Sequence, residues 1–319
     1  MKALLEAARR GDRRALARLV SLLENEPGRV VDLFGKGVEW TSPGLTLAVT
    51  GPPGVGKSTF VSALLGRLRE KNPSGRIAVL AVDPTSPYSG GAVLGDRVRM
   101  MEHSLDEGVF IRSFANRGRL GGLAPGIRAV LRLLGLTGWD LALLETVGVG
   151  QSEVEAASVA DLVAVLLAPG QGDGVQMLKA GLLETADLFV VHKADRPGAD
   201  RMAAEIRAAL DMAEPGEGGR PPVLLVSSVE GRGVDAFLAA LEARRKDLAE
   251  RIRRRREGAR EEDARLALLH EAGARLEKVL EGKREILRAL LSGGMSLEAA
   301  VEELLRAAWG EETDKGGKP

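Results

Sequence analysis

One stretch decides the fold of this chain, Gly51-Pro52-Pro53-Gly54-Val55-Gly56-Lys57-Ser58-Thr59. It matches the pattern G-x-x-x-x-G-K-[ST] in full, and it lies between an apolar run at residues 45–49 and a helix-like pattern at residues 60–68. The stretch and its context predict a phosphate-binding loop whose backbone N–H groups and helix N-terminus face an anion. We therefore expect all nine residues to bind a nucleotide, with Lys57 as a catalytic cation and Ser58 as a ligand of Mg²⁺.

Short aliphatic runs alternate with helical patterns from the phosphate loop onward. Such runs predict an α/β fold with a mostly parallel, doubly wound P-loop NTPase sheet, covered by helices on both faces. Ligands of these sheets bind at the carboxyl ends of the strands, so residues that follow each run are the candidates for chemistry. The expected strands are Leu45–Thr50, Ile77–Asp83, Val109–Phe114, Leu141–Glu145, Leu162–Ala168, Leu188–His192 and Val223–Ser227.

Composition narrows the function further. With 45% hydrophobic but only 3% aromatic residues, the core must be aliphatic. Equal counts of Lys+Arg and Asp+Glu, 45 each, argue against bulk capture by nucleic acid or by an anionic membrane. The chain has no cysteine and only three histidines, which argues against disulfides and against thiolate or His-rich metal sites. Because no apolar run is long enough to span a bilayer, we expect a soluble, cytoplasmic protein.

Helical patterns flank the expected sheet on both sides. Residues 1–40 predict an N-terminal helical arm, broken near Gly11-Asp12 and packed on the P-loop domain of residues 41–240. Residues 241–310 predict a C-terminal helical arm, and residues 311–319 a disordered tail.

The C-terminal arm has two informative patterns. Acidic residues interleave the basic residues at 244–246 and the arginine-rich run at 251–256, which favours a solvated, salt-bridged helix surface over a nucleic-acid site. An apolar stripe over residues 266–291 predicts one helix that ends at Ser292-Gly293-Gly294, and Ser296 is expected to cap a shorter helix through Trp309. Such a helical hairpin is either additional core or a dimerisation arm.

Acids and glycines after two of the expected strands point to a metal and to the terminal phosphate. Asp83 ends the second run, and Asp96 follows on a loop rich in Gly, Pro and Ser. Glu145 ends the fourth run, and Gly148 follows three residues later, as in a Walker B arrangement in which the acid bonds a metal-bound water and the glycine N–H touches phosphate. We expect Asp83, Asp96 and Glu145 near Mg²⁺, with Glu145 and Gly148 catalytic.

A candidate switch segment follows the fifth run. The loop from residue 169 is rich in small and turn-forming residues, and Gln176 and Lys179 lie one helical turn apart on a common face. These two residues suit a switch that meets the nucleotide or a partner, although a plain solvated helix start explains the pattern equally well.

The base-binding candidates follow the sixth and seventh runs. His192-Lys193-Ala194-Asp195 stands where GTPases carry Asn-Lys-x-Asp, in which the acid accepts two hydrogen bonds that guanine offers and adenine cannot. Asp195 is thus the expected guanine selector, and Lys193 can lie along the base plane. His192 departs from the usual Asn, because an imidazole cannot donate and accept with the fixed geometry of an amide. Ser227-Ser228-Val229 is expected to contact the guanine carbonyl oxygen.

These residues resemble a known family, the GTPases that associate with methylmalonyl-CoA mutase and act as chaperones of its adenosylcobalamin cofactor. The resemblance runs from about Leu4 to Trp309. The motifs that carry it are the phosphate loop, Ala-Val-Asp-Pro-Thr-Ser-Pro at 81–87, Gly-Gly-Ala-Val-Leu-Gly-Asp-Arg-Val-Arg-Met at 90–100, Glu-Thr-Val-Gly-Val-Gly-Gln-Ser-Glu at 145–153 and Lys-Ala-Asp at 193–195.

The resemblance implies a homodimer joined by the C-terminal helices. It also implies GTP binding and slow hydrolysis with Mg²⁺, used to gate cofactor loading and to protect or reactivate methylmalonyl-CoA mutase or a related acyl-CoA mutase. Gln176 and Lys179 match the segment that communicates with the mutase. Two departures from the family are His192 in place of Asn, and Gly174 where that segment usually has an acid.

Three other functions stay open. An ATP-dependent kinase on the same fold is opposed by Asp195, and a GTPase that delivers nickel is opposed by the absence of Cys and the scarcity of His. A purely structural interaction module would show no hydrolysis even with the mutase present.

Overall fold

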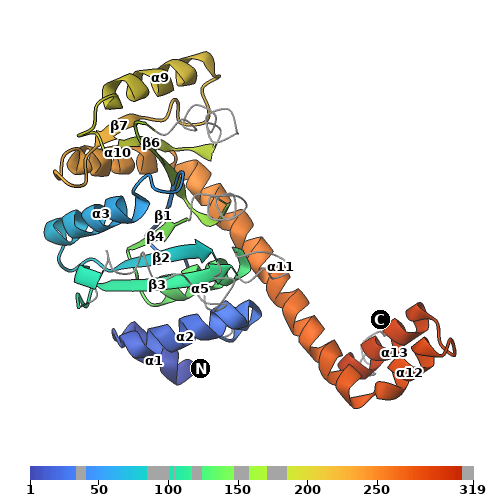
Figure 1. Ribbon diagram of the computed structural model, residues 1–319. Helices are drawn as coiled ribbons and strands as arrows, with labels where there is room; N and C mark the ends of the chain where they lie inside the picture. Colours follow the sequence, from blue (N-terminus) through green and yellow to red (C-terminus); the bar gives the residue numbers. More distant parts are fainter. Residues whose placement is uncertain are drawn as a thin grey trace, which may run out of the picture. The chain divides into compact units, whose positions relative to one another are not determined.

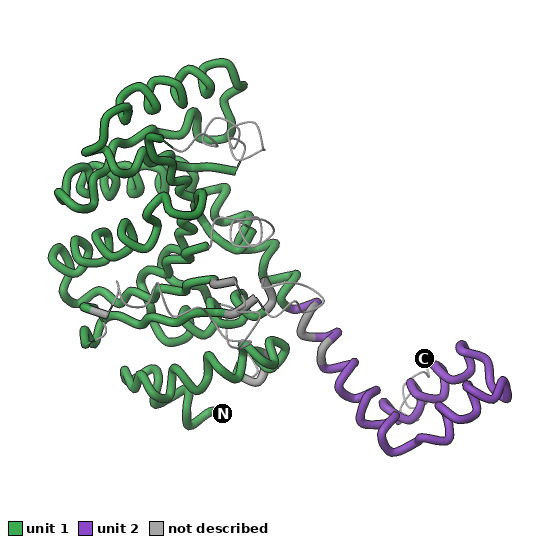
Figure 2. The backbone as a smooth tube through the Cα atoms, in the orientation of Figure 1, with its two compact units in different colours: residues 1–263 green, residues 264–319 purple. Residues whose placement is uncertain are grey.

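The computed structural model of the 319-residue chain describes residues 1–33, 41–84, 101–103, 105–116, 124–146, 158–170 and 185–310. The chain divides into two compact units, residues 1–263 and residues 264–319 (Figure 2). The first unit holds the sheet and the phosphate loop. The domain boundaries expected at residues 40, 240 and 310 stay predictions.

Seven strands form one sheet, and every neighbouring pair is parallel. Their order is β3-β2-β4-β1-β5-β6-β7, so β1, which leads into the phosphate loop, is the central strand (Figure 1). The predicted α/β class with a parallel sheet is confirmed. The strands are β1 (Leu45–Thr50), β2 (Ile77–Pro84), β3 (Val109–Asn116), β4 (Leu141–Glu145), β5 (Leu162–Leu167), β6 (Leu188–His192) and β7 (Val223–Val226).

Helices cover both faces of the sheet, which explains why the inner strands are apolar throughout. Leu47 of β1 packs in one core with α3 (Lys57–Lys71) and α10 (Val234–Asp247). Its neighbour Ala48 belongs to a second core, shared with α5 (Ala124–Leu136) and α9 (Ala199–Met212). Successive residues of a strand thus face opposite helical layers. A short 3₁₀ turn, η3 (Met101–His103), precedes β3.

The N-terminal helices extend the second core. Helices α1 (Lys2–Arg9) and α2 (Arg13–Asn25) are separated at Gly11-Asp12, as predicted, and the 3₁₀ turn η1 (Pro27–Leu33) follows. The Asp12 carboxylate caps α2, because it accepts hydrogen bonds from the N–H groups of Arg14 (2.9 Å) and Ala15 (3.1 Å). Since the buried residues of α1 and α2 share a core with α5, the N-terminal arm packs onto the sheet-bearing unit.

Helix α11 (Ala249–Gly282) begins with the arginine-rich run, and its arginines have two kinds of partner. Arg253 is exposed and pairs with Glu250 and Glu257 on the same helix, as predicted for a solvated surface. Arg251 and Arg256 are partly buried and instead bind acids 64 and 95 residues away in the sequence. For these two arginines the solvated-surface prediction is wrong, because the pattern along one helix does not reveal partners from another element.

Those distant partners are Asp161 and Asp187, each placed just before a strand. Asp161 accepts from the N–H of Thr46 (2.7 Å) and Asp187 from the N–H of Val163 (2.9 Å), so each carboxylate joins two neighbouring strands at their amino ends. Arg256 lies 2.6 Å from Asp161, between Nη2 and Oδ2. The start of α11 is therefore held to the amino ends of the strands, on the side of the sheet opposite the phosphate loop.

The second unit contains the end of α11, α12 (Arg284–Leu291) and α13 (Leu297–Trp309). The Ser296 hydroxyl accepts from the N–H of Ala299 at 3.1 Å, which confirms the predicted cap of α13. The prediction of one helix over residues 266–291 is wrong, because the chain leaves helical geometry at Lys283 (φ −119°, ψ 59°), directly after Gly282. Across the described ranges, no helix is long and apolar enough to cross a bilayer.

Candidate functional site

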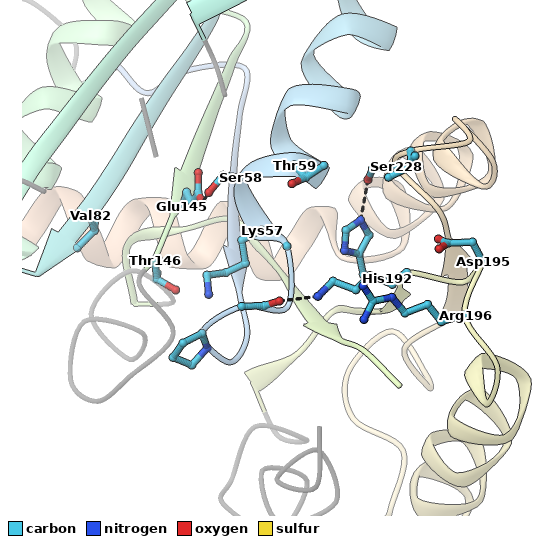
Figure 3. A pocket seen from close by; sticks show the side chains of 15 residues that line it. Lys57, Ser58, Thr59, Val82, Glu145, Thr146, His192, Asp195, Arg196 and Ser228 are labelled. Carbon is cyan, nitrogen blue, oxygen red and sulfur yellow. Dashed lines mark hydrogen bonds between the residues drawn. The ribbon is translucent and has the colours of Figure 1, made fainter. Parts of the chain in front are cut away.

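Loops at the carboxyl ends of β1, β4, β6 and β7 surround a cavity of about 520 Å³ (Figure 3). The phosphate loop, the acid that ends β4, the base-binding candidates after β6 and the loop after β7 all reach it, as expected for parallel strands. The described residues that line it are Pro53, Gly54, Gly56, Lys57, Ser58, Thr59, Val82, Glu145, Thr146, His192, Lys193, Asp195, Arg196, Ser228 and Val229.

Two glycines of the phosphate loop are required by close contacts. At Gly51 (φ 143°) a Cβ atom would lie 2.2 Å from the carbonyl oxygen of Leu166, and at Gly56 (φ 103°) it would lie 2.6 Å from Nδ1 of His192. Both backbone conformations are also ones that other residues rarely adopt. Gly56 caps α3, so the N-terminus of that helix opens directly onto the loop.

Lys57 is held by the loop that it follows. Its ammonium group donates to the carbonyl oxygens of Gly51 (2.7 Å) and Pro52 (3.1 Å), and the residue is only 6% exposed. The positive charge is therefore fixed inside the curve of the loop, where the N–H groups would receive a polyphosphate.

The next residue, Ser58, contacts the acid that ends β4. The Ser58 hydroxyl donates to Oε1 of Glu145 at 2.5 Å, and both residues are buried. A hydroxyl and a carboxylate are hard oxygen donors of the kind that Mg²⁺ prefers, and Mg²⁺ takes its other ligands from water and substrate phosphates. The residues present thus fit this ion. Among the described residues, no cluster of three or more His, Cys, Asp or Glu could hold a metal.

Five predicted site residues cannot be placed by their side chains. Asp83 lies in β2, but its side chain lies outside what the structure describes. Asp96, Gly148, Gln176 and Lys179 lie outside the described residues altogether. Their metal, phosphate and switch roles stay predictions.

His192 connects the phosphate loop to the loop after β7. Its Nδ1 lies 2.8 Å from the carbonyl oxygen of Val55, and its Nε2 lies 2.7 Å from the hydroxyl of Ser228 (Figure 3). A carbonyl oxygen can only accept, so Nδ1 carries the proton, and in the neutral ring Nε2 accepts from the Ser228 O–H. Burial lowers the pKa of His192 below its usual value, which favours this neutral form. Both ring nitrogens are thereby engaged within the protein.

Asp195 presents an ionised carboxylate to the cavity. The Ser227 hydroxyl donates to its Oδ1 at 2.7 Å, and this hydrogen bond lowers the pKa of the exposed Asp195 carboxyl. Lys193, with a φ of 55°, donates from its ammonium group to the carbonyl oxygen of Gly54 at 2.6 Å. Nearby, Val229 is 87% exposed. The turn after β6 thus presents the Asp195 carboxylate to the cavity, and its lysine reaches the phosphate loop.

The structure also brings in lining residues that the sequence patterns did not single out. Thr146 follows Glu145, and its hydroxyl donates to that of Thr50 at 3.0 Å, which joins the ends of β4 and β1. Arg196 follows Asp195 and lines the base end of the cavity. Their one signal in the sequence is that each directly follows a predicted site residue.

A parallel sheet with a phosphate loop on its central strand, a serine–carboxylate pair beside the loop and an ionised acid at the base end defines a P-loop GTPase. Residues 16–280 match the family model described as methylmalonyl-CoA mutase-associated GTPase MeaB, and the chain belongs to this family.

Relatives agree with this assignment. A protein of Pyrococcus horikoshii that carries a provisional GTPase name is 39% identical over 307 residues, covering 95% of this chain and 96% of that protein. The GTPase ArgK of Escherichia coli is 38% identical over 241 residues, covering 73% and 72%. A Caenorhabditis elegans protein named methylmalonic aciduria type A homolog, mitochondrial, is 39% identical over 199 residues, covering 61% of this chain and 50% of that protein.

A solved structure shares the fold over nearly the whole length. The crystal structure described as a LAO/AO transport system kinase superposes with a TM-score of 0.65 at 27% identity, covering 95% of this chain and 96% of that one.

Proposed function

We propose that this chain binds GTP with Mg²⁺ in the cavity, hydrolyses it slowly, and uses the cycle to gate adenosylcobalamin loading of methylmalonyl-CoA mutase or a related acyl-CoA mutase. In this role it protects or reactivates the mutase. The observation that carries the proposal is one cavity that combines the phosphate loop, the Ser58–Glu145 pair and the ionised Asp195. The family and the name of the C. elegans relative support the mutase as the client.

The proposed roles follow from the charges at each end. Lys57 and the loop N–H groups would bind the β- and γ-phosphates, and Ser58 and Glu145 would hold Mg²⁺, with Asp83 and Asp96 as further predicted ligands. The bound ion would neutralise charge on the phosphates. Of the described residues that line the cavity, Arg196 is the one arginine, and it comes from the turn that carries Asp195 rather than from the phosphate loop. Slow turnover without a partner is therefore expected.

The base end would select guanine through Asp195. Titration calorimetry with Mg²⁺ should compare GDP and a slow GTP analogue with ADP and a slow ATP analogue. We expect a guanine preference of at least about tenfold, because only guanine offers two donors to one carboxylate. Equal or reversed preference would contradict the proposal.

One alternative function rests on specific observations. His192 replaces the usual Asn, and the similar solved structure is described as a kinase, so an ATP-dependent kinase is the second candidate. A preference for ATP in the same titration would support it.

The client is tested separately from the nucleotide. GTP hydrolysis and adenosylcobalamin transfer should be measured with and without methylmalonyl-CoA mutase. We expect the mutase to raise the hydrolysis rate and the nucleotide state to change transfer. A rate and a transfer that are both independent of the mutase would contradict the client assignment while leaving GTP binding intact.

A homodimer through the C-terminal helices is also part of the proposal. Leu291 and Leu297, in the second unit, are 87% and 66% exposed, and Trp309 is 43% exposed. Large exposed apolar side chains of this kind are typical of interaction surfaces. Analytical ultracentrifugation of the wild-type chain and of Leu291→Asp should show a dimer that the substitution weakens.

A further inference from the structure

Arg196 is a cation of the nucleotide cavity that the motif does not include. It directly follows Asp195, and its backbone N–H donates to the carbonyl oxygen of Lys193 at 2.9 Å, which fixes the turn that carries both side chains. Arg196 is exposed and lines the cavity. In Figure 3 its side chain extends from this turn toward the phosphate-loop side of the view.

The two lysines that line this cavity donate hydrogen bonds to carbonyl oxygens of the phosphate loop. Lys57 donates to Gly51 and Pro52, and Lys193 donates to Gly54. By contrast, the Arg196 guanidinium makes no hydrogen bond or ion pair with any residue that the structure describes. Nearby exposed arginines are paired: Arg201 binds Glu205, for example.

The position of Arg196 favours a contact with the base of the nucleotide over a contact with its phosphates. In the proposed site, Asp195 would accept hydrogen bonds at the edge of the base, in its plane, so the next residue in the sequence would lie close to the same ring. A guanidinium is planar and weakly hydrated, and it stacks on aromatic faces, whereas an ammonium acts as a point charge. The phosphate loop already has Lys57 and a helix N-terminus for the phosphates.

We propose that Arg196 is a nucleotide-binding residue whose guanidinium stacks on the face of the purine that Asp195 holds at its edge. This inference rests on the proposed nucleotide site. It assigns the two neighbouring residues different tasks: Asp195 discriminates between bases, and Arg196 adds affinity that is nearly independent of which purine is bound.

The test is a set of titrations of the full chain with GDP, ADP and guanosine, each with Mg²⁺. Arg196→Ala should weaken GDP and ADP by the same factor, about five- to tenfold, and should weaken guanosine equally, because the contact is with the base. Arg196→Lys keeps the charge without the plane and should behave like Arg196→Ala. Arg201→Ala is the matched control, since Arg201 is exposed on α9 and pairs with Glu205; it should bind like the wild type.

Each departure from this pattern overturns the inference. If Arg196→Ala binds GDP and ADP as tightly as the wild type, Arg196 does not contact the nucleotide. If Arg196→Lys binds as tightly as the wild type, or if Arg196→Ala keeps its affinity for guanosine, Arg196 contacts a phosphate through its charge and not the base. A loss confined to GDP makes it an edge contact with guanine. If the wild-type chain binds none of these nucleotides, the proposed site itself fails, and that outcome is distinct from a failure of Arg196.

Discussion

The phosphate end and the base end of the cavity are built in different ways. At the phosphate end, Lys57 donates to carbonyl oxygens five and six residues before it in the sequence, so the loop itself positions this charge. At the base end, His192 bonds Val55 and Ser228, which lie on two other loops. Substitutions at the phosphate end should therefore affect every nucleotide, whereas those at the base end should change which nucleotide is preferred.

The largest effect is expected at the phosphate end. Lys57→Ala removes the charge that is fixed inside the loop. Because charge-assisted hydrogen bonds to phosphate are strong, this variant should bind both GTP and ATP roughly a hundredfold more weakly. It should also show no measurable hydrolysis. Calorimetry measures the affinities, and phosphate release measures the hydrolysis. Lys71→Ala, at the exposed far end of the same helix, is the control. Selective loss of GTP alone would contradict the division between the two ends.

The second effect is a change of preference at the base end. Asp195→Asn replaces an acceptor of two N–H groups with an amide, so GDP should bind about thirtyfold more weakly, and xanthosine diphosphate, which presents a carbonyl in place of the amine, should gain affinity. Asp200→Asn, in the first turn of α9, is the matched control. Competition titrations of the two nucleotides measure the exchange. An equal loss for both would place Asp195 outside base recognition.

The sequence predicts the phosphate end better than the base end for a physical reason. A complete phosphate loop needs only a strand, glycines and a helix in succession, and all three are visible in residues 45–68. The aliphatic runs likewise predict all seven strands, because a sheet covered on both faces needs apolar residues throughout.

Long-range pairs were not predictable in the same way. The engagement of both nitrogens of His192, the Thr146–Thr50 bond and the binding of Arg256 to Asp161 all join residues from different elements. No periodicity in one segment encodes them. The interruption of the C-terminal helix after Gly282 was also missed, since the apolar stripe continues on both sides of it.

The third prediction tests whether His192 reproduces the usual Asn. His192→Asn keeps one donor and one acceptor, and it should bind GDP within about threefold of the wild type. His192→Ala leaves the buried Val55 carbonyl without this donor, and should lower the free energy of unfolding by roughly 1–3 kcal/mol and GDP affinity by about tenfold. Urea unfolding and calorimetry measure the two quantities. Equal behaviour of both variants would contradict the bridging role.

The smallest effect is a pH dependence confined to the base end. Burial lowers the pKa of His192, and Lys193 adds to this, whereas the Val55 carbonyl and Asp195 oppose it. Because the folded pKa lies below the unfolded value of about 6.5, the stabilisation from neutral His192 is complete above that pH. This stabilisation decreases as the pH falls from about 6.5 toward the pKa of the folded state, because the unfolded chain binds the proton first. The free energy of unfolding changes by at most about 1.4 kcal/mol per pH unit in this range.

Carboxyl groups titrate in the same range, so the informative quantity is the difference between the wild type and His192→Asn. Unfolding free energies measured by urea at a series of pH values should show the wild type losing stability relative to the variant only below about pH 6.5. Lys57→Ala leaves His192 and both of its hydrogen-bond partners in place, so a matched series with this variant should follow the wild-type pH profile. If Lys57→Ala and His192→Asn alter the pH profile equally, the two ends of the cavity respond to protons as one unit. That result would contradict the separation of the phosphate end from the base end that their hydrogen bonds indicate.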